Sequence, residues 1–400
     1  MRKALNAQAY QLILLIFNLV FLMDDQANYQ AFVDGIFGKD VVSIEQTVET
    51  NYVIGALNKP GEYEVFKENF HNRLCMLRDK FRDSKSYPPL LNKVKEVAYS
   101  KNWDGAYAEL VAYSVLSCSK CPVDILLEQS LPVTESYANE LGGHETNEDG
   151  LIKDFGIFFD VKRLGDTTRE LIQTIILMVL DTKSFSKKCH INPEFQIDDD
   201  DEVYQKNFNV LRAELEKELT EGVEHIESSI INGLRYNVVW GAGVSSAIST
   251  YEPYRHAYNW RNLIFERYTK KILKHNKFFL VLVNFPWYNN LITDFSRSNE
   301  VLYRALARRT FCGYMHSDQK MNTLLKKFNG DDTVFDVSRH ISGLIFIEDH
   351  SILRNSYSCY TYLNPNAYNP VGCGEDYLQF IVNQSEKNTG MFDTLRYDNY

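Results

Sequence analysis

The chain has 400 residues, of which 44% are hydrophobic and 24% charged, a composition typical of a globular protein with two or three domains. Its formal net charge of −10 argues against a protein that is basic over its whole surface. Seven cysteines in no dense pattern argue against a disulfide framework and favour reduced thiols in the cytoplasm. Cys118 and Cys121 are expected to be free, because no second pair completes a zinc site.

The charge is unevenly distributed along the chain. Between Glu194 and Glu227 there are twelve acidic residues and three basic ones, so this stretch carries nearly all of the net charge. Between Arg255 and Lys277 the balance reverses, with seven basic residues against Glu266. Because a local basic surface can bind phosphates whatever the overall sign of the charge, a nucleic-acid partner is compatible with this sequence.

The first hundred residues are predicted to be mainly helical. Residues 1–26 begin with two basic side chains, followed by an apolar run from Leu12 to Met23. This run is too short to span a bilayer, and no small-residue cleavage site follows it. We expect a buried N-terminal helix, with a cleaved signal peptide as the alternative.

The next helix is almost free of charge. From Gly105 to Ser119, Glu109 is the only charged residue among small and apolar side chains. This pattern predicts a buried helix. The segment 123–140 that follows is a candidate for the first strand of a central sheet.

A β-hairpin is predicted within residues 147–164. Turn residues at 154–156 separate two apolar runs, and the second run, 157–159, has the aromatic and β-branched side chains of a buried strand. The strand continues through Asp160 and Lys162, which share one face because side chains alternate along a strand. A carboxylate and an ammonium group are an unusual end for a buried strand.

The length of the turn decides which acid faces Asp160. A two-residue turn at Asp154 and Phe155 places Asp149 directly opposite, about 5 Å away, and two carboxylates that close repel unless a cation lies between them. A three-residue turn shifts the register by one, and Asp154 then replaces Asp149. Oxygen-only ligands favour Mg²⁺ (or Mn²⁺), which keeps several waters. Lys162 could then orient a water or stabilise charge on a phosphoryl oxygen.

This hairpin resembles the core of the PD-(D/E)xK, restriction-endonuclease-like nucleases. Asp160-Val161-Lys162 matches the (D/E)xK half, and Asp149 fits the acid of the preceding strand, although Gly150 follows it and no proline precedes it. The family also carries a Glu on the helix ahead of the hairpin, which corresponds to Glu109. The resemblance covers about residues 100–182. It implies a metal-dependent nuclease in which Glu109, Asp149 and Asp160 hold the metal.

A capping box at Thr167 begins a further helix. The segment 171–180 is almost wholly apolar and is expected to pack against the sheet. In the resembling family this helix often carries a polar active-site residue, so Gln173 is a candidate. The acidic run 198–202 is typical of a solvated loop, and one long charged helix is expected over 210–231.

A glycine turn supports a competing hypothesis. A predicted strand leads into Gly241-Ala242-Gly243, which is how dinucleotide-binding turns begin and which also resembles the opening of sirtuin-like NAD-binding domains. The third glycine position of that motif holds Ser246, and no acidic residue is suitably placed after a second strand. Glycine in a strand can instead mark a bulge or a close backbone approach.

The region after residue 255 alternates helices and strands. Basic helices are expected over 256–274 and 300–311, and buried strands over 278–285 and 343–348. This order predicts parallel strands, which extend the sheet of the hairpin or form a second α/β lobe. The candidate phosphate contacts on the two helices are Arg267, Lys270, Lys271, Lys274, Arg304, Arg308 and Arg309.

The predicted architecture is an α/β protein with a mixed central sheet flanked by helices. It comprises a helical N-terminal region at 1–100, the nuclease core at 101–185, an acidic helical insertion at 186–235, an α/β portion at 236–350 and an irregular C-terminal tail at 351–400.

The predicted function is a Mg²⁺- or Mn²⁺-dependent nuclease, above all a DNA endonuclease, located in the cytoplasm. Three alternatives accompany it: an NAD- or nucleotide-binding enzyme, a non-catalytic nucleic-acid-binding or regulatory protein, and a secreted protein if the N-terminus is cleaved. No membrane partner is expected, and a homo-oligomer is compatible with the sequence.

Overall fold

The computed structural model of the chain contains two compact units. Unit 1 consists of Met1–Leu164, Leu263–Tyr288 and Leu306–Tyr400, and unit 2 of Gly165–Asn262 and Asn289–Ala305. Within these ranges the structure describes residues 28–44, 51–59, 61, 63–99, 103–117, 123–130, 147–165, 167–182, 185, 187–195, 201–241, 246–247, 253–275, 277–285, 296–311, 333–352 and 357–371.

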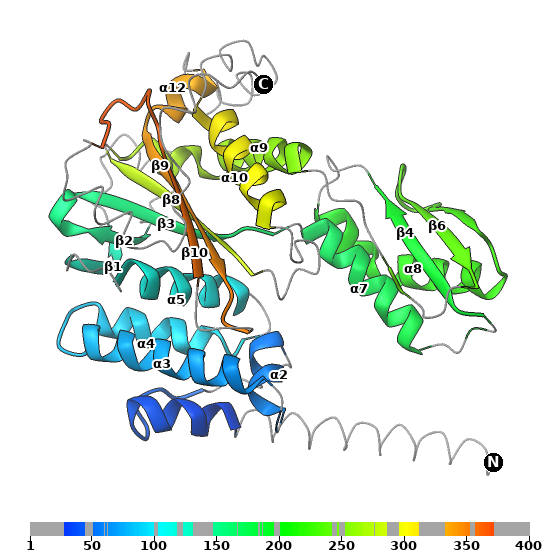
Figure 1. Cartoon of the computed structure of the whole chain (residues 1–400), viewed down its shortest axis with the longest axis horizontal. Helices are drawn as coiled ribbons and strands as arrows, with labels where there is room; N and C mark the ends of the chain where they lie inside the picture. Colours follow the sequence, from blue (N-terminus) through cyan, green and yellow to red (C-terminus); the bar gives the residue numbers. More distant parts are fainter. Residues whose placement is uncertain are drawn as a thin grey trace. The chain divides into compact units, whose positions relative to one another are not determined.

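Unit 1 is built on a six-stranded mixed sheet with the order β1-β2-β3-β8-β9-β10 (Figure 1). β1, β2 and β3 are antiparallel neighbours, β3, β8 and β9 run parallel, and β10 pairs antiparallel with β9. The predicted α/β class is confirmed, and the later strands extend the sheet of the hairpin. The six strands are Ile125–Ser130, Asn147–Ile152, Ile157–Arg163, Phe278–Asn284, Ile341–Asp349 and Tyr357–Leu363.

Helices flank this sheet. Those on the side of α5 are α2 (Tyr52–Asn58), α3 (Glu64–Phe81), α4 (Tyr87–Glu96) and α5 (Trp103–Ser117) itself (Figure 1). The second half of α9 (Pro253–Ile272) lies on the other side, where its last turn reaches Asp160 of β3. Further helices are α10 (Ser296–Phe311) and the short α12 (Val334–Ser338), which begins with a capping box at Thr333.

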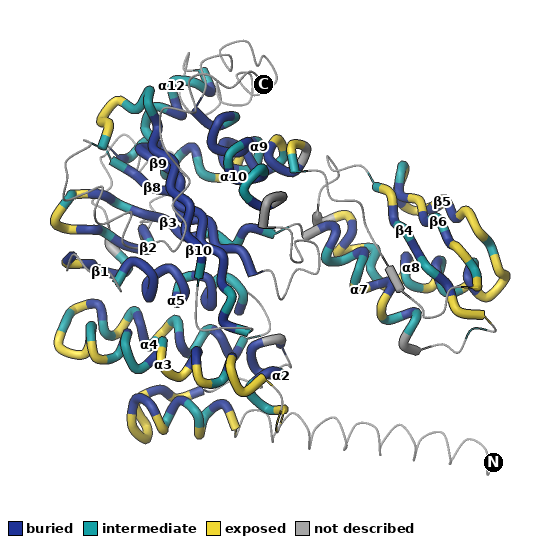
Figure 2. Tube along the Cα trace, in the orientation of Figure 1, coloured by how far each residue is buried: buried dark blue, intermediate teal, exposed yellow. Residues whose placement is uncertain are grey.

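Alternation of side chains along β3 separates its apolar and charged residues. Phe159 and Val161 join the apolar core against α5. Asp160, which lies between them, is fully buried as well but points to the opposite face, as does Lys162. α5 is buried along nearly its whole length because α3, α4 and the sheet surround it, which explains its apolar sequence (Figure 2).

Two glycine–phenylalanine pairs lie across neighbouring strands of the sheet. Gly150 of β2 pairs with Phe159 of β3, and Gly343 of β9 pairs with Phe279 of β8. In each pair the phenylalanine ring occupies the space that a Cβ atom on the glycine would need. Gly150 departs from the pattern of the PD-(D/E)xK nucleases that the hairpin resembles. Its role here is in packing, because it leaves room for the Phe159 ring of β3.

Unit 2 is a smaller α/β body with its own core. Its four-stranded sheet has the order β5-β6-β4-β7, with strands His225–Glu227, Arg235–Trp240, Cys189–Glu194 and Ser246–Ala247. α7 (Thr167–Thr182) and α8 (Asp201–Thr220) bury apolar residues against each other and against this sheet. Ile175 of α7, Leu215 of α8 and Tyr236 of β6 are members of this core.

The helix after the hairpin packs differently from the prediction. The sequence places α7 on the sheet of the hairpin, whereas in the structure it packs on α8 in unit 2. An apolar helix must be buried, but its sequence does not say against which element. The stretch predicted as an acidic helical insertion also supplies β4, β5 and the start of β6 to the same unit.

The C-terminal region also differs from the prediction. β10 lies in the stretch predicted as an irregular tail, and it is an edge strand whose residues are almost all buried. Its sequence, Tyr-Ser-Cys-Tyr-Thr-Tyr-Leu, lacks the apolar–polar alternation of a half-exposed strand because both of its faces are covered.

The segment 1–26, for which a buried helix and a signal peptide compete, lies outside the described residues, as do Cys118 and Cys121. Among the described residues, Cys75, Cys189 and Cys359 are free thiols. None of the helices in the described part combines the length and apolar character that a membrane span requires.

Candidate active site

The hairpin positions the charged residues of the site. β2 and β3 pair through Gly150–Phe159, Leu151–Phe158 and Ile152–Ile157, which is the register that the predicted two-residue turn requires. The connection is a 3-10 turn over Lys153–Phe155, closed by Gly156 at a φ of 62°. The ladder ends at Gly150, so Asp149 is the first residue beyond it and remains close to β3.

Asp160 is the centre of the site. Its side chain has no exposed surface, and Lys162 Nζ lies 2.7 Å from Asp160 Oδ2. A second lysine, Lys271 of α9, donates a hydrogen bond to Asp160 Oδ1. Burial by itself raises the pKa of Asp160, but the two ammonium groups outweigh burial and hold that pKa below its usual value.

Asp149 is the second acid of the site. Its Oδ2 accepts a hydrogen bond from the Val161 backbone N–H at 2.6 Å and lies 3.8 Å from Lys162 Nζ. Burial, followed by repulsion from Asp160 and Glu109, raises the pKa of Asp149 well above its usual value. Neighbouring carboxyl groups with pKa values shifted in opposite directions are typical of functional sites, although structural ion-pair networks also produce them.

Glu109 lies next to the hairpin, as the resemblance implies. The Tyr113 hydroxyl, one turn further along α5, donates to Glu109 Oε2 at 2.8 Å and also contacts the Asp149 carbonyl oxygen at 3.2 Å. Lys93 of α4 lies 3.1 Å from Glu109 and 3.6 Å from Glu128 of β1. Burial raises the pKa of Glu109, and Lys93 and Tyr113 only partly oppose that rise.

Three further residues on the α9 side belong to this cluster and were not predicted as part of the site. Glu148 is fully buried, and its carboxylate lies 3.0 Å from Lys271 Nζ and 3.0 Å from His275 Nε2. The His275 ring stacks on Phe278, with ring centroids 5.1 Å apart. Tyr268, one turn before Lys271, places its ring 5.3 Å from Lys162 Nζ in a cation–π contact.

A signal for these residues exists in the sequence but is weak. Glu148 directly precedes Asp149, and His275 follows Lys271 of the last turn of α9 by four residues, just beyond the end of the helix. The sequence pattern predicts that Lys271 belongs to a phosphate-binding stripe with Lys270 and Lys274. The sequence could not show that its side chain points toward the acids of the hairpin.

The chemistry of this cluster fits a divalent cation. Five carboxylates (Glu109, Glu128, Glu148, Asp149 and Asp160) face three lysines (Lys93, Lys162 and Lys271). Burial, and then repulsion from Asp160 and Glu109, raise the pKa of Asp149 well above its usual value. Both Glu148 oxygens make ionic contacts without the geometry of a hydrogen bond. Oxygen donors of this kind suit Mg²⁺, which needs only one or two carboxylates.

Three acids do not converge on one point. Among the residues that the structure describes, no group of three or more His, Cys, Asp or Glu side chains is arranged to hold a metal ion. Asp149 and Asp160 are therefore the two residues that would hold Mg²⁺ or Mn²⁺. Glu109, the third predicted ligand, is held by Lys93 and Tyr113 beside them.

Two other predicted residues are not members of the cluster. Asp154 is exposed in the hairpin turn, where it accepts a hydrogen bond from the Asp124 backbone N–H at 2.7 Å. The structure thus brings Asp149, and not Asp154, next to Asp160. Gln173 lies on α7 in unit 2, whereas the cluster lies in unit 1.

The predicted phosphate contacts divide into two groups. On α9, Arg267 is exposed and Lys270 is half-buried, and Lys274, also half-buried, lies in the turn just after the helix. Their spacings of three and four residues are those of a single stripe. Burial lowers the pKa of Lys274, and the nearby charges of Lys271 and Lys270 lower it further, as expected where cations are concentrated. Glu148 acts in the opposite direction and raises that pKa. On α10, Arg308 is buried, and Arg304 and Arg309 are only partly accessible.

The glycine turn does not have the surroundings of a dinucleotide site. β6, which ends just before Gly241, pairs antiparallel with both β4 and β5. Ser246 and Ala247 form β7 where a phosphate-binding turn would begin its helix. Ala242 and Gly243 lie outside the described residues.

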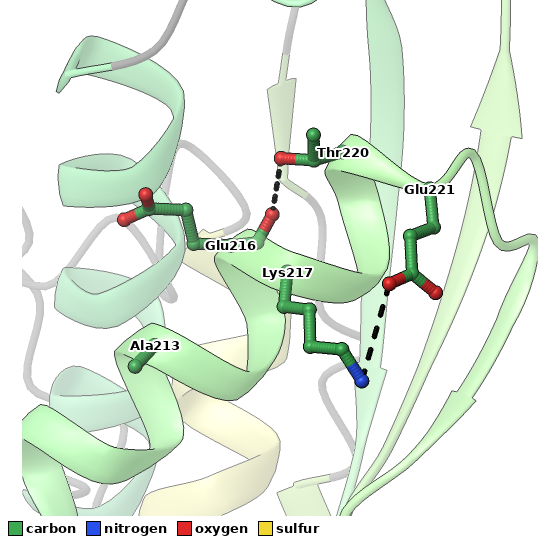
Figure 3. A pocket seen from close by; sticks show the side chains of 5 residues that line it. All are labelled: Ala213, Glu216, Lys217, Thr220 and Glu221. Carbon is green, nitrogen blue, oxygen red and sulfur yellow. Dashed lines mark hydrogen bonds and ion pairs between the residues drawn. The ribbon is translucent and has the colours of Figure 1, made fainter.

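Figure 3 shows a hollow on α8 in unit 2, with a volume of about 260 Å³. It is lined by Ala213, Glu216, Lys217, Thr220 and Glu221. Lys217 Nζ lies 4.0 Å from Glu221, and the Thr220 hydroxyl donates to the Glu216 carbonyl at 2.7 Å. The hollow lies between side chains of successive helical turns and is open to solvent, so we assign it no function.

Comparisons with protein-family models, curated proteins and solved structures found no match for this chain.

Proposed function

We propose that this protein is a metal-dependent phosphodiesterase that acts on nucleic acid, as a DNA endonuclease. The observation that carries the proposal is the buried Asp160, paired with Lys162 on the same strand and adjacent to Asp149. Glu109 on the preceding helix completes the order of residues that resembles the PD-(D/E)xK nucleases. Asp149 and Asp160 would hold Mg²⁺ or Mn²⁺.

The residues of the chain would divide the work as follows. A bound divalent cation would stabilise charge on a phosphoryl oxygen and lower the pKa of a water molecule. Lys162, held between Asp160 and the Tyr268 ring, would orient the attacking water or stabilise developing charge. Glu109 and Tyr113 would support Asp149 from the α5 side.

The basic stripe at the end of α9, defined as Arg267 and Lys270 of the helix and Lys274 of the turn after it, would supply the phosphate contacts. It continues the helix face beside Lys271, whose own ammonium group is on Asp160 and Glu148. The stripe therefore lies next to the site within unit 1. The buried Arg308 is not suited to the same task, which favours α9 over α10 for binding nucleic acid.

Nicking and cutting of plasmid DNA tests the catalytic proposal. Cleavage should require Mg²⁺ or Mn²⁺ and be lost with Asp160→Asn. Lys162→Met should lower turnover by about 100-fold or more while largely sparing DNA binding, because Lys162 acts in the transition state. Asp154→Asn, an exposed acid of the same hairpin, is the matched control and should cleave normally. Cleavage that continues in the presence of a chelator would refute the metal-dependent reaction.

The salt dependence of DNA binding tests the role of α9. Changing Arg267, Lys270 and Lys274 together to Gln should weaken binding to all DNA sequences alike. The slope of log affinity against log salt should flatten by up to about 0.9 per lost phosphate contact. Turnover at saturating DNA should change little, since these groups bind the ground state and the transition state equally. An unchanged slope would show that the DNA lies elsewhere.

A non-catalytic nucleic-acid-binding protein is the second candidate. The observation that favours it is that Asp160, Glu109 and Glu148 are each within ion-pair distance of a lysine of the chain itself. A site whose acids are compensated in this way can be structural. Salt-sensitive DNA binding without any metal-dependent cleavage would support this candidate over the nuclease.

A further inference from the structure

Lys271 has a position that the resemblance does not account for. It comes from the last turn of α9, far in sequence from the hairpin, and its ammonium group bridges two buried acids. It donates a hydrogen bond to Asp160 Oδ1 and lies 3.0 Å from Glu148 Oε2. Its side chain is 17% exposed, whereas both acids have no exposed surface.

This position is one that a metal ion would also use. Lys162 and Lys271 each lie against a different carboxylate oxygen of Asp160. A divalent cation bound to Asp160 must therefore displace one of the two ammonium groups from its oxygen. Two positive charges cannot share the same oxygen without strong repulsion in a buried site.

Lys271 is the better candidate for displacement. Lys162 is two residues from Asp160 on the same strand, and its ammonium group also contacts the Tyr268 ring. Lys271 reaches the site from a separate element through a flexible side chain of four methylene groups. Lys271 also lies 3.0 Å from Glu148 Oε2, so its ammonium group keeps a carboxylate partner when it leaves Asp160.

We propose that Lys271 is an internal counter-ion that competes with a divalent cation for Asp160 and thereby sets the metal affinity of the site. This inference rests on the proposed function, because it assumes that Asp160 is a metal ligand. In the absence of metal, Lys271 neutralises Asp160 and Glu148. When metal binds, the Lys271 ammonium group leaves Asp160 and keeps only its interaction with Glu148.

Metal binding to the full-length protein tests the inference without measuring activity. Titration calorimetry with MnCl₂, together with the rise in melting temperature that Mn²⁺ causes, should be compared between the unmodified protein and Lys271→Met. Removing the competing charge should increase Mn²⁺ affinity by at least about tenfold. The rise in melting temperature should be larger too, because a ligand stabilises the folded protein by RT ln(1 + [L]/Kd), which grows as Kd falls.

Two matched variants separate this effect from a general change in charge. Lys271→Arg keeps the positive charge and should bind Mn²⁺ as weakly as the unmodified protein. Lys153→Met removes a lysine from the turn of the same hairpin, where it pairs with Asp124 at 3.1 Å, and should leave Mn²⁺ affinity nearly unchanged. The comparison is between melting temperatures with and without metal, so a loss of stability in Lys271→Met does not obscure it.

The possible outcomes distinguish this inference from the proposed function. The inference would be overturned if Lys271→Met and the unmodified protein bound Mn²⁺ with equal affinity. If Asp160→Asn abolished that binding in both proteins, the metal site itself would still be supported. If no variant binds Mn²⁺ in a way that depends on Asp160, the metal site fails and the inference fails with it. Tighter binding in Lys271→Met but not in Lys271→Arg or Lys153→Met supports it.

Discussion

The carboxylates of the hairpin and those around α8 differ in their surroundings, although both occur in acidic parts of the chain. Asp160 and Glu148 of unit 1 have no exposed surface and contact Lys162, Lys271 and His275. Glu221, after α8 in unit 2, is 57% exposed and lies 4.0 Å from a similarly exposed Lys217. In unit 1, burial and repulsion from Asp160 and Glu109 raise the pKa of Asp149 well above its usual value.

The number of acidic residues in a stretch of sequence therefore does not indicate whether those residues form a site. The stretch around α8 has twelve acidic residues, but water solvates exposed charges and screens them from one another. The acids of the hairpin are fewer and come from separate elements, yet they are buried together. Buried charges need partners, so the lysines of three elements converge on them.

The largest expected effect is on stability when a buried charge loses its counter-ion. Asp160→Asn leaves Lys162 and Lys271 partly buried without their main partner. It should lower the free energy of unfolding at pH 7 by about 3 kcal/mol or more. Urea denaturation followed by circular dichroism measures this change. A loss below about 1 kcal/mol would mean that the cluster is effectively solvated and that the contrast with α8 is false.

A second, slightly smaller effect concerns the packing beneath the charges. Gly150→Ala introduces a Cβ atom where the Phe159 ring lies and should destabilise the protein by about 1–3 kcal/mol. Gly105→Ala in α5 has open space at its Cβ position and should be neutral or stabilising by up to about 1 kcal/mol. Thermal denaturation of the two variants compares them. Equal changes in the stability of the two variants would show that the hairpin does not depend on the Gly150–Phe159 pair.

The pH dependence of stability should have opposite signs for the two aspartates. The raised pKa of Asp149 means that wild-type stability falls as pH rises above the unfolded value of about 4. Asp149→Asn removes that loss, so the stability of the variant relative to the wild type should increase as pH rises. The lowered pKa of Asp160 gives stability that is present above about pH 4 and lost as pH falls through the folded value.

Melting temperatures of both variants between pH 3.5 and 8 measure this contrast. The deficit of Asp160→Asn should shrink at the acidic end, whereas the advantage of Asp149→Asn should grow toward pH 8. The same sign of pH dependence in both variants would contradict the opposite pKa shifts of Asp149 and Asp160.

The smallest effect is expected in unit 2. Glu221→Gln removes an exposed charge whose ion pair with Lys217 is long and solvated. The free energy of unfolding should change by less than about 0.5 kcal/mol, with little dependence on pH above 5. Urea denaturation under the same conditions as for Asp160→Asn gives the direct comparison, and a change comparable to that of Asp160→Asn would remove the distinction between the two regions.

The local elements of the site could be predicted from the residue pattern. The apolar run before Asp160 required a buried strand, and the turn residues between 154 and 156 required a hairpin. Alternation along that strand required Asp160 and Lys162 to share a face, and the uncharged surroundings of Glu109 required a buried helix. These features depend only on the residues within one turn or one strand, so the pattern was sufficient to find them.

Contacts between residues that are distant in the sequence could not be predicted in this way, because they depend on how the elements pack. The apolar face of α7 required a partner but fitted the core of unit 2 as well as a sheet of unit 1. Lys271 and Lys270 are adjacent in a basic helix, and only the packing of α9 turns Lys271 toward Asp160 and Glu148. The physical reason is that burial and charge pairing are properties of contacts between elements, and periodicity along one element does not identify its neighbours.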